Sequence, residues 1–220
     1  MIFQDREEAG SLLAEALRDR IHPEDNPIVL AIPRGGIPVA YVVARELNIP
    51  MSVVVVRKLG LPWNEEAGFG AIDSDGATYL DEELVNYAKL DADTIAEIAE
   101  RELRELRNRE KKFLPSGYPN LSGREVIVVD DGVATGYTAV ASAGFAKKRG
   151  AKRVIVAVPV CPKDTARRFK GYADEFVCYH PSSEMSFSVG MFYRDFHQLS
   201  DEEALGYIER AKREGLWEPV

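Results

Sequence analysis

The sequence is poor in the residues that build metal centres and disulfide frameworks. It has two cysteines, Cys161 and Cys178, among 220 residues. They lie in separate predicted elements, without the spacing of a zinc site and without the number that a disulfide scaffold needs. This cysteine usage is typical of a reducing compartment, so we expect a cytoplasmic location.

Long apolar runs are also missing. No uncharged stretch approaches the roughly 20 residues that a transmembrane helix requires, so we expect no membrane partner. The N-terminus becomes charged from Asp5 to Glu8, which is unlike a signal peptide. No Gly-x-Gly-x-x-Gly follows a predicted strand, which disfavours a dinucleotide enzyme.

Positive charge is in deficit. The chain has 28 lysines and arginines against 36 acidic residues, for a net charge of −8. A protein that grips nucleic acid by its phosphates needs a basic surface, so we expect no nucleic-acid partner. A small anionic substrate stays compatible with this balance, because one local site can be positive on an acidic protein.

Apolar strands alternate with amphipathic helices along most of the chain. Strands are expected at 28–32, 52–56, 126–129, 153–160 and 175–178, and helices at 5–20, 38–47, 139–149, 162–170 and after Ser200. This alternation predicts an α/β fold with a mostly parallel twisted sheet and helices on both faces. We expect a single domain over 1–220, with a core at about 28–178 and a helical insertion of two helices at about 81–114.

The most informative stretch begins with the apolar run from Val126 to Val129, which predicts a buried strand. Two carboxylates, Asp130 and Asp131, follow directly. In open α/β sheets, ligands bind at the carboxyl ends of strands. These acids are therefore well placed to accept hydrogen bonds from ligand hydroxyl groups.

A loop of small residues then leads into the predicted helix. A helix N-terminus offers free N–H groups and a positive dipole end, which suit a phosphate. Thr135 and Thr138 add hydroxyl donors, and Gly136 lets the backbone approach an anion closely. Acceptors for hydroxyl groups beside donors for a phosphate predict a sugar phosphate site. The alternative is a buried strand with an acidic turn and a helix cap.

The order Asp-Asp-x-x-x-Thr-Gly-x-Thr resembles the phosphoribosyl diphosphate (PRPP) motif of the type I phosphoribosyltransferases. The resemblance implies transfer of a phosphoribosyl group from PRPP to a nitrogenous base or similar nitrogen nucleophile, with release of pyrophosphate. Asp130 and Asp131 would hold the ribose, act in catalysis and touch a Mg²⁺ ion that is bound mostly by PRPP. The 5′-phosphate loop would comprise Val133, Ala134, Thr135, Gly136, Tyr137 and Thr138.

A second strand–loop–helix unit carries the loop Pro33-Arg34-Gly35-Gly36. In the resembled family this loop grips the pyrophosphate of PRPP, often through a strained or cis non-proline peptide. Arg34 and Gly35 are therefore expected to bind substrate, and the Arg34–Gly35 bond is the expected site of that peptide. The alternative is a glycine-rich turn with a surface arginine.

Two cations, Arg57 and Lys58, follow the apolar run at 52–56. Cations at the carboxyl end of a buried strand suit a diphosphate, with arginine as a bidentate partner. We expect both to bind substrate, and Arg34 and Lys58 to take part in catalysis. A solvated strand end is the alternative.

The segment from Leu59 to Asp75 is crowded with glycine and proline, which predicts a mobile loop with some β structure. A hairpin is expected around Asp73-Ser74-Asp75-Gly76. In the resembled family this segment often covers the active site and excludes water. Glu65 and Glu66 could act as a base here, although glutamates on polar loops are more often only solvated.

The acceptor is not identified by the sequence. In the resembled family a variable hood, here about 1–22 and 179–220, stacks the base on an aromatic ring. Phe187, Phe192 and Tyr193 are candidates, or they form a small hydrophobic cluster that holds the tail.

Two departures from the family pattern narrow the choice of acceptor. Members that use 6-oxopurines carry an acid where this chain has Ala134 and a lysine where it has Tyr137. Their absence disfavours 6-oxopurines as the acceptor.

A PRPP-binding regulator without transferase activity is the alternative function. The helical insertion could supply a homodimer contact.

Overall fold

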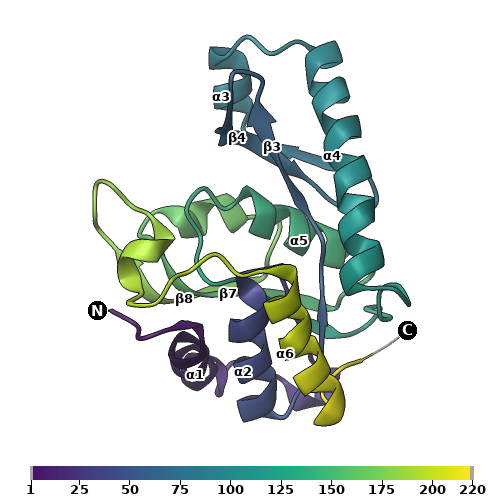
Figure 1. Ribbon diagram of the computed structural model, residues 1–220, viewed down its shortest axis with the longest axis vertical. Coiled ribbons are helices and arrows are strands. Elements are labelled where there is room, and N and C mark those ends of the chain that lie inside the picture. The colour runs from purple at the N-terminus through teal and green to yellow at the C-terminus, as the bar shows by residue number, and fades with distance from the viewer. Residues whose placement is uncertain (1, 219–220) are drawn as a thin grey trace.

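The structure is a computed structural model that describes residues 2–218, except the side chain of Glu66 (Figure 1). The predictions that involve Met1, Pro219 and Val220 as parts of the domain, and the Glu66 side chain as a base, therefore lie outside the described residues.

A five-stranded parallel sheet forms the centre, in the order β2-β1-β6-β7-β8. The strands are β1 (Ile28–Ala31), β2 (Met51–Val53), β6 (Glu125–Val129), β7 (Arg153–Pro162) and β8 (Glu175–Ser182). Apolar, β-branched runs of this kind suit strands that are covered on both faces. The predicted fold class is confirmed, and β8 lies at an edge as expected.

Helices cover both faces of this sheet (Figure 1). Successive strand side chains point to opposite faces. Val29 and Ile127 pack in one core with residues of α1 (Arg6–Leu17), α2 (Gly36–Leu47) and α6 (Asp201–Arg213). Leu30 and Val128 pack in a second core with α5 (Tyr137–Lys148). Because these strands are apolar at successive positions, both faces of the sheet are apolar and each face forms its own core.

Helix starts follow the capping signals of the sequence. The Asp5 carboxylate accepts a hydrogen bond of 2.9 Å from the Glu8 backbone N–H and so caps α1. Ser200 and Glu203 form a complete capping box at the start of α6. The segment predicted as a helix at 162–170 forms only a 3₁₀ turn, Thr165–Phe169. Two further 3₁₀ turns are Pro23–Asp25 and Val189–Phe192.

Residues 57–113 form an arm that rises from the sheet (Figure 1). It contains an antiparallel sheet, β3-β4-β5, and two helices. The elements are β3 (Arg57–Leu61), β4 (Asn64–Ile72), β5 (Thr78–Leu80), α3 (Glu82–Tyr87) and α4 (Ala92–Phe113). The two helices expected between 81 and 114 are thus present, and α4 runs from the far end of the arm back to the body.

The β structure expected in part of 59–75 extends over most of this segment, as the paired strands β3 and β4, whose register shifts at Gly60. Leu59, Leu61 and Phe69 are buried in one core with Ile98 and Leu106 of α4. The hairpin expected around Asp73-Ser74-Asp75-Gly76 is confirmed, because it joins the antiparallel strands β4 and β5. None of the helices in the described part of the chain has both the length and the apolar character to cross a bilayer.

Candidate functional site

The two predicted binding loops meet at the carboxyl edge of the sheet. The Ile32 amide donates to the Val129 carbonyl at 2.9 Å, which ties the β1–α2 loop to the end of β6. A Cβ at position 35 would overlap the Asp131 carboxylate, and one at position 36 would lie 2.6 Å from the Val129 oxygen. Glycine is therefore needed at both positions by lack of space. The structure brings the two motifs into one site.

The cis peptide of this site joins Pro33 and Arg34. It lies one bond before the Arg34–Gly35 bond that we expected from the sequence.

The predicted phosphate loop presents a helix N-terminus to solvent. Gly136 caps α5 with φ of 91°, in the left-handed region that favours glycine. Ala134 and Thr135 are exposed. Among residues 2–218, the backbone amides of 134–138 donate no hydrogen bond to the protein. This loop therefore keeps its donors available for an anion.

Two residues at the ends of this loop are already engaged. Val133 is buried, and its amide donates to the Val160 carbonyl at 3.0 Å. Burial and a hydrogen bond with Asp81 raise the pKa of Tyr137 to about 12. The Arg168 guanidinium lies 5.2 Å from the centre of the Tyr137 ring. Tyr137 can therefore offer an anion its amide, while its hydroxyl is held elsewhere.

The two adjacent acids have different surroundings. Asp131 is 9% exposed and accepts a 2.8 Å hydrogen bond from Nε of Arg6, itself 8% exposed. Asp130 accepts a 2.9 Å hydrogen bond from the Asp131 amide. Burial and the neighbouring Asp131 charge raise the pKa of Asp130 well above its usual range. Burial also raises the pKa of Asp131, but the Arg6 charge opposes that rise.

A crevice of about 300 Å³ opens beside these groups. Three of its side chains are arginines and one is a carboxylate, so this site is locally positive on an acidic protein. We call this cavity the crevice; it is lined by Arg6, Arg34, Gly35, Arg109, Asp131, Phe196, His197, Gln198 and Leu199.

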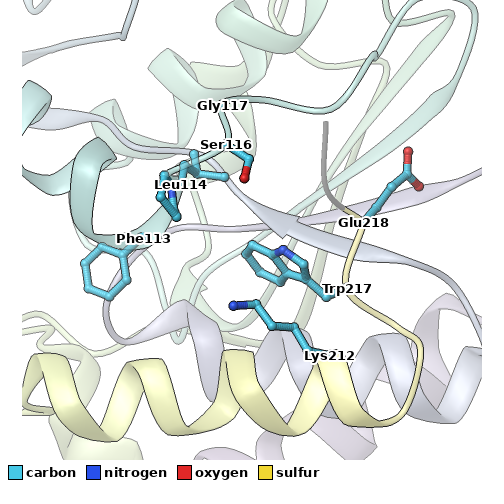
Figure 2. Close-up of a pocket in the computed structure, with 8 residues that line it drawn as sticks. Phe113, Leu114, Ser116, Gly117, Lys212, Trp217 and Glu218 are labelled. Carbon is cyan, nitrogen blue, oxygen red and sulfur yellow. The ribbon is translucent and has the colours of Figure 1, made fainter.

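Figure 2 shows a second cavity, of about 290 Å³, between the end of α4 and the C-terminal segment. Phe113, Lys212 and Trp217 line it, and it shares no lining residue with the crevice. None of the sequence-predicted site residues lies there.

The predicted cations are placed differently from one another. Arg34 lines the crevice and pairs with Asp201 at 3.2 Å. Arg57 instead begins β3 and donates two hydrogen bonds, of 2.6 and 2.9 Å, to Glu102 of α4. Neither Arg57 nor Lys58 lines the crevice. β2 ends at Val53 and the Val54 amide still donates to the Ala31 carbonyl of β1, whereas Arg57 and Lys58 lie beyond this pairing, in β3 of the arm.

Comparison with known proteins identifies the family. The model of the family described as "Phosphoribosyl transferase domain" matches residues 3–196. The chain belongs to the phosphoribosyl transferase family. It is 42% identical over 219 residues to proteins from two strains of Mycobacterium tuberculosis, each named "Putative phosphoribosyl transferase". The match covers 97% of this chain and 48% of each relative, so the chain spans about half the length of these curated relatives.

A solved structure is similar to this chain over nearly its whole length. The crystal structure of the protein TT1426 from Thermus thermophilus shares 37% sequence identity with it, at a TM-score of 0.77. The similarity covers 96% of this chain and 99% of the other.

The aromatic rings of the C-terminal tail are mostly buried. Phe192 and Tyr193 pack with Phe3 in a hydrophobic cluster, and Phe187 packs against Phe192 with ring centres 5.3 Å apart. The Tyr193 hydroxyl donates to the Asp131 carbonyl. Burial leaves Phe192 and Tyr193 little surface for a ligand, as in the alternative interpretation of these rings. The ring that lines the crevice is Phe196.

Sequence reasoning did not predict six of the residues that line the crevice: Arg6, Arg109, Phe196, His197, Gln198 and Leu199. Phe196 lies in the same aromatic run as the predicted rings, and its ring centre is 4.1 Å from the Arg6 guanidinium. Arg6 sits on the first helix, 125 residues from its partner Asp131. Arg109 comes from a helix whose many charges predict only a solvated face. No local pattern marks the two arginines.

Proposed function

We propose that this chain binds PRPP with Mg²⁺ at the carboxyl edge of the sheet, with the diphosphate in the crevice, and transfers its phosphoribosyl group to a nitrogen nucleophile. One observation supports this proposal above the others. A half-buried acid, Asp130, a buried acid, Asp131, and a loop whose amides donate no hydrogen bond to the protein all follow the carboxyl end of the parallel strand β6, where α/β folds bind ligands.

Each group has a role that follows from its placement. The amides of 134–138 and the Thr135 hydroxyl bind the 5′-phosphate. Asp130 accepts hydrogen bonds from the ribose hydroxyls. The Asp131 amide donates a hydrogen bond to the Asp130 carboxylate, and Arg6 holds the Asp131 side chain in place. Arg34 and the Gly35 backbone bind the diphosphate. Lys58 lies outside the crevice, so the proposal gives it no role.

The chemistry requires positioning more than proton transfer. The bond between ribose C1 and the diphosphate oxygen breaks, and its electron pair leaves with pyrophosphate. The lone pair of the nucleophilic nitrogen forms the new bond to C1, and the proton of that nitrogen leaves to solvent. Fixed cations around the diphosphate and an aligned nucleophile favour this transition state.

Magnesium fits this site as an ion carried by the substrate. Among the described residues, the only metal-sized cluster of His, Cys, Asp or Glu is His22, Asp25 and Glu125. Glu125 begins β6, so this cluster lies at the opposite end of the sheet. Asp130 and Asp131 are hard oxygen donors that would reach the ion alongside substrate oxygens and waters. The ion would neutralise diphosphate charge.

The first test is ligand binding. Mg²⁺ with PRPP is expected to raise the melting temperature, because a ligand present at 100 times its Kd stabilises the folded state by about 2.7 kcal/mol. Thr135→Val removes one donor to a charged oxygen, worth about 1.5–3 kcal/mol, and should weaken binding roughly tenfold or more. Thr78→Val, on an exposed strand position outside the crevice, is the control. An equal shift in wild type and Thr135→Val would contradict the phosphate assignment.

A second test separates a transferase from a PRPP-binding regulator. The protein is incubated with PRPP, Mg²⁺ and a panel of nitrogenous bases, and released pyrophosphate is measured. We expect release that depends on one class of base, with 6-oxopurines inactive because position 134 carries no acid. PRPP binding without release for any base in the panel would favour the regulator.

A further inference from the structure

Arg109 differs from the other arginines of this region. It is half-buried on α4 and lines the crevice beside Arg34 and Gly35. Arg6 pairs with Asp131, Arg34 with Asp201 and Arg57 with Glu102. Within residues 2–218, Arg109 forms no ion pair or hydrogen bond through its side chain.

The surroundings of Arg109 disfavour its charge. Burial and the charges of Arg57 and Arg34 lower its pKa. The two carboxylates whose charges favour the Arg109 cation are committed elsewhere: Asp201 pairs with Arg34 and Lys112, and Glu102 pairs with Arg57 and Arg101. A half-buried cation among like charges costs free energy unless an anion joins it. The crevice beside it has room for one.

We infer that Arg109 binds the diphosphate of PRPP together with the Arg34-Gly35 loop, an inference that rests on the proposed function. The position of the side chain selects the diphosphate. Arg109 shares the crevice with the β1–α2 loop, whereas none of residues 133–138 lines that crevice. A guanidinium fits phosphate oxygens in a bidentate geometry, and negative charge grows on the diphosphate as it leaves. The arm therefore contributes a substrate-binding residue through α4.

The test compares two ligands that differ by the diphosphate. Binding of PRPP and of ribose 5-phosphate is measured by calorimetry with Mg²⁺, for wild type, Arg109→Gln, Arg109→Lys and Arg104→Gln. Arg104 lies on the same helix, is exposed and pairs with Glu100, so it is the matched control. We expect Arg109→Gln to weaken PRPP binding 10–100-fold and to change ribose 5-phosphate binding less than twofold. The PRPP affinity of Arg109→Lys should lie between those of wild type and Arg109→Gln, and Arg104→Gln should bind both ligands as wild type does.

The outcomes separate the two proposals. A wild type that binds neither ligand would refute the proposed function and, with it, the role of Arg109. A wild type that binds both, with Arg109→Gln unchanged or equally weakened toward both, would refute the role of Arg109 alone. Because Arg109 is repelled by its neighbours, Arg109→Gln should fold with a melting temperature no lower than that of wild type. Ligand-free melting curves check this.

Discussion

Replacing Arg6 by methionine is expected to lower the free energy of unfolding by about 3–5 kcal/mol at neutral pH. Arg6 and Asp131 are both buried, and their hydrogen bond is 2.8 Å long. Removal of the guanidinium leaves the Asp131 carboxylate buried without a countercharge. Urea denaturation gives the free energy. Arg18→Met, at an exposed position that ends the same helix, should change it by less than about 0.5 kcal/mol.

The loss of unfolding free energy in Arg6→Met is expected to depend on pH in a defined direction. Without Arg6, the pKa of Asp131 rises further in the folded state, because the charge that opposes the rise is gone. A carboxyl group with a raised folded pKa contributes stability below its unfolded pKa of about 3.9, and that contribution is lost as pH rises through the folded pKa. The deficit of Arg6→Met should therefore be largest above neutral pH and shrink toward pH 4. A deficit independent of pH, or equal to that of Arg18→Met, would argue against the buried pair.

Asp130→Asn is expected to weaken PRPP binding about 100-fold and, in the same protein, to stabilise the ligand-free fold. Binding weakens because charge-assisted hydrogen bonds to the ribose hydroxyls, worth about 1.5–3 kcal/mol each, lose their charge. The free protein gains because asparagine removes a buried charge beside Asp131, while its side-chain oxygen still accepts from the Asp131 amide. A substitution that weakens ligand binding often stabilises the ligand-free protein, because binding-site residues are selected for function and not for stability.

The size of the gain depends on pH in a way that can be measured. The folded pKa of Asp130 is raised, so the wild type loses stability as pH rises through that pKa. A one-unit rise of the pKa is equivalent to about 1.4 kcal/mol. The advantage of Asp130→Asn should therefore grow from pH 5 to pH 8 in urea denaturation. Asp164→Asn, at an exposed position, is the control. Lower stability of Asp130→Asn at every pH, or unchanged PRPP binding, would contradict this account.

The elements that the sequence predicts best are those fixed by short-range signals. Apolar, β-branched runs such as Val126–Val129 have few alternatives to a buried strand, and the acids and small residues after it define a loop and a helix start. The capping box at Ser200 is equally local. These signals were enough to predict the parallel sheet and the two loops that meet at its carboxyl edge.

The errors arise where tertiary packing decides. The apolar run at 52–56 looks like one strand, yet β2 ends at Val53 and the chain passes through buried residues 54–56 into β3 of the arm. Periodicity does not show where a buried run leaves the sheet, so the sequence does not reveal that Arg57 and Lys58 begin a strand of the arm. Arg6 and Arg109 reach the crevice from helices distant in sequence, and nothing in their neighbourhoods marks them. Phe192 and Phe196 lie in one aromatic run, and only packing decides which ring is buried.

The two ends of the described chain complete the crevice together. The Phe3 amide donates to the Phe192 carbonyl, and Arg6 donates to the His197 carbonyl. Arg34 is held by Asp201, which begins α6. During synthesis, Arg6 of the first helix therefore lacks its His197 partner until the segment around residue 200 has emerged from the ribosome. On the proposed function, a chain that ends before this segment would have an incomplete crevice and would not bind PRPP.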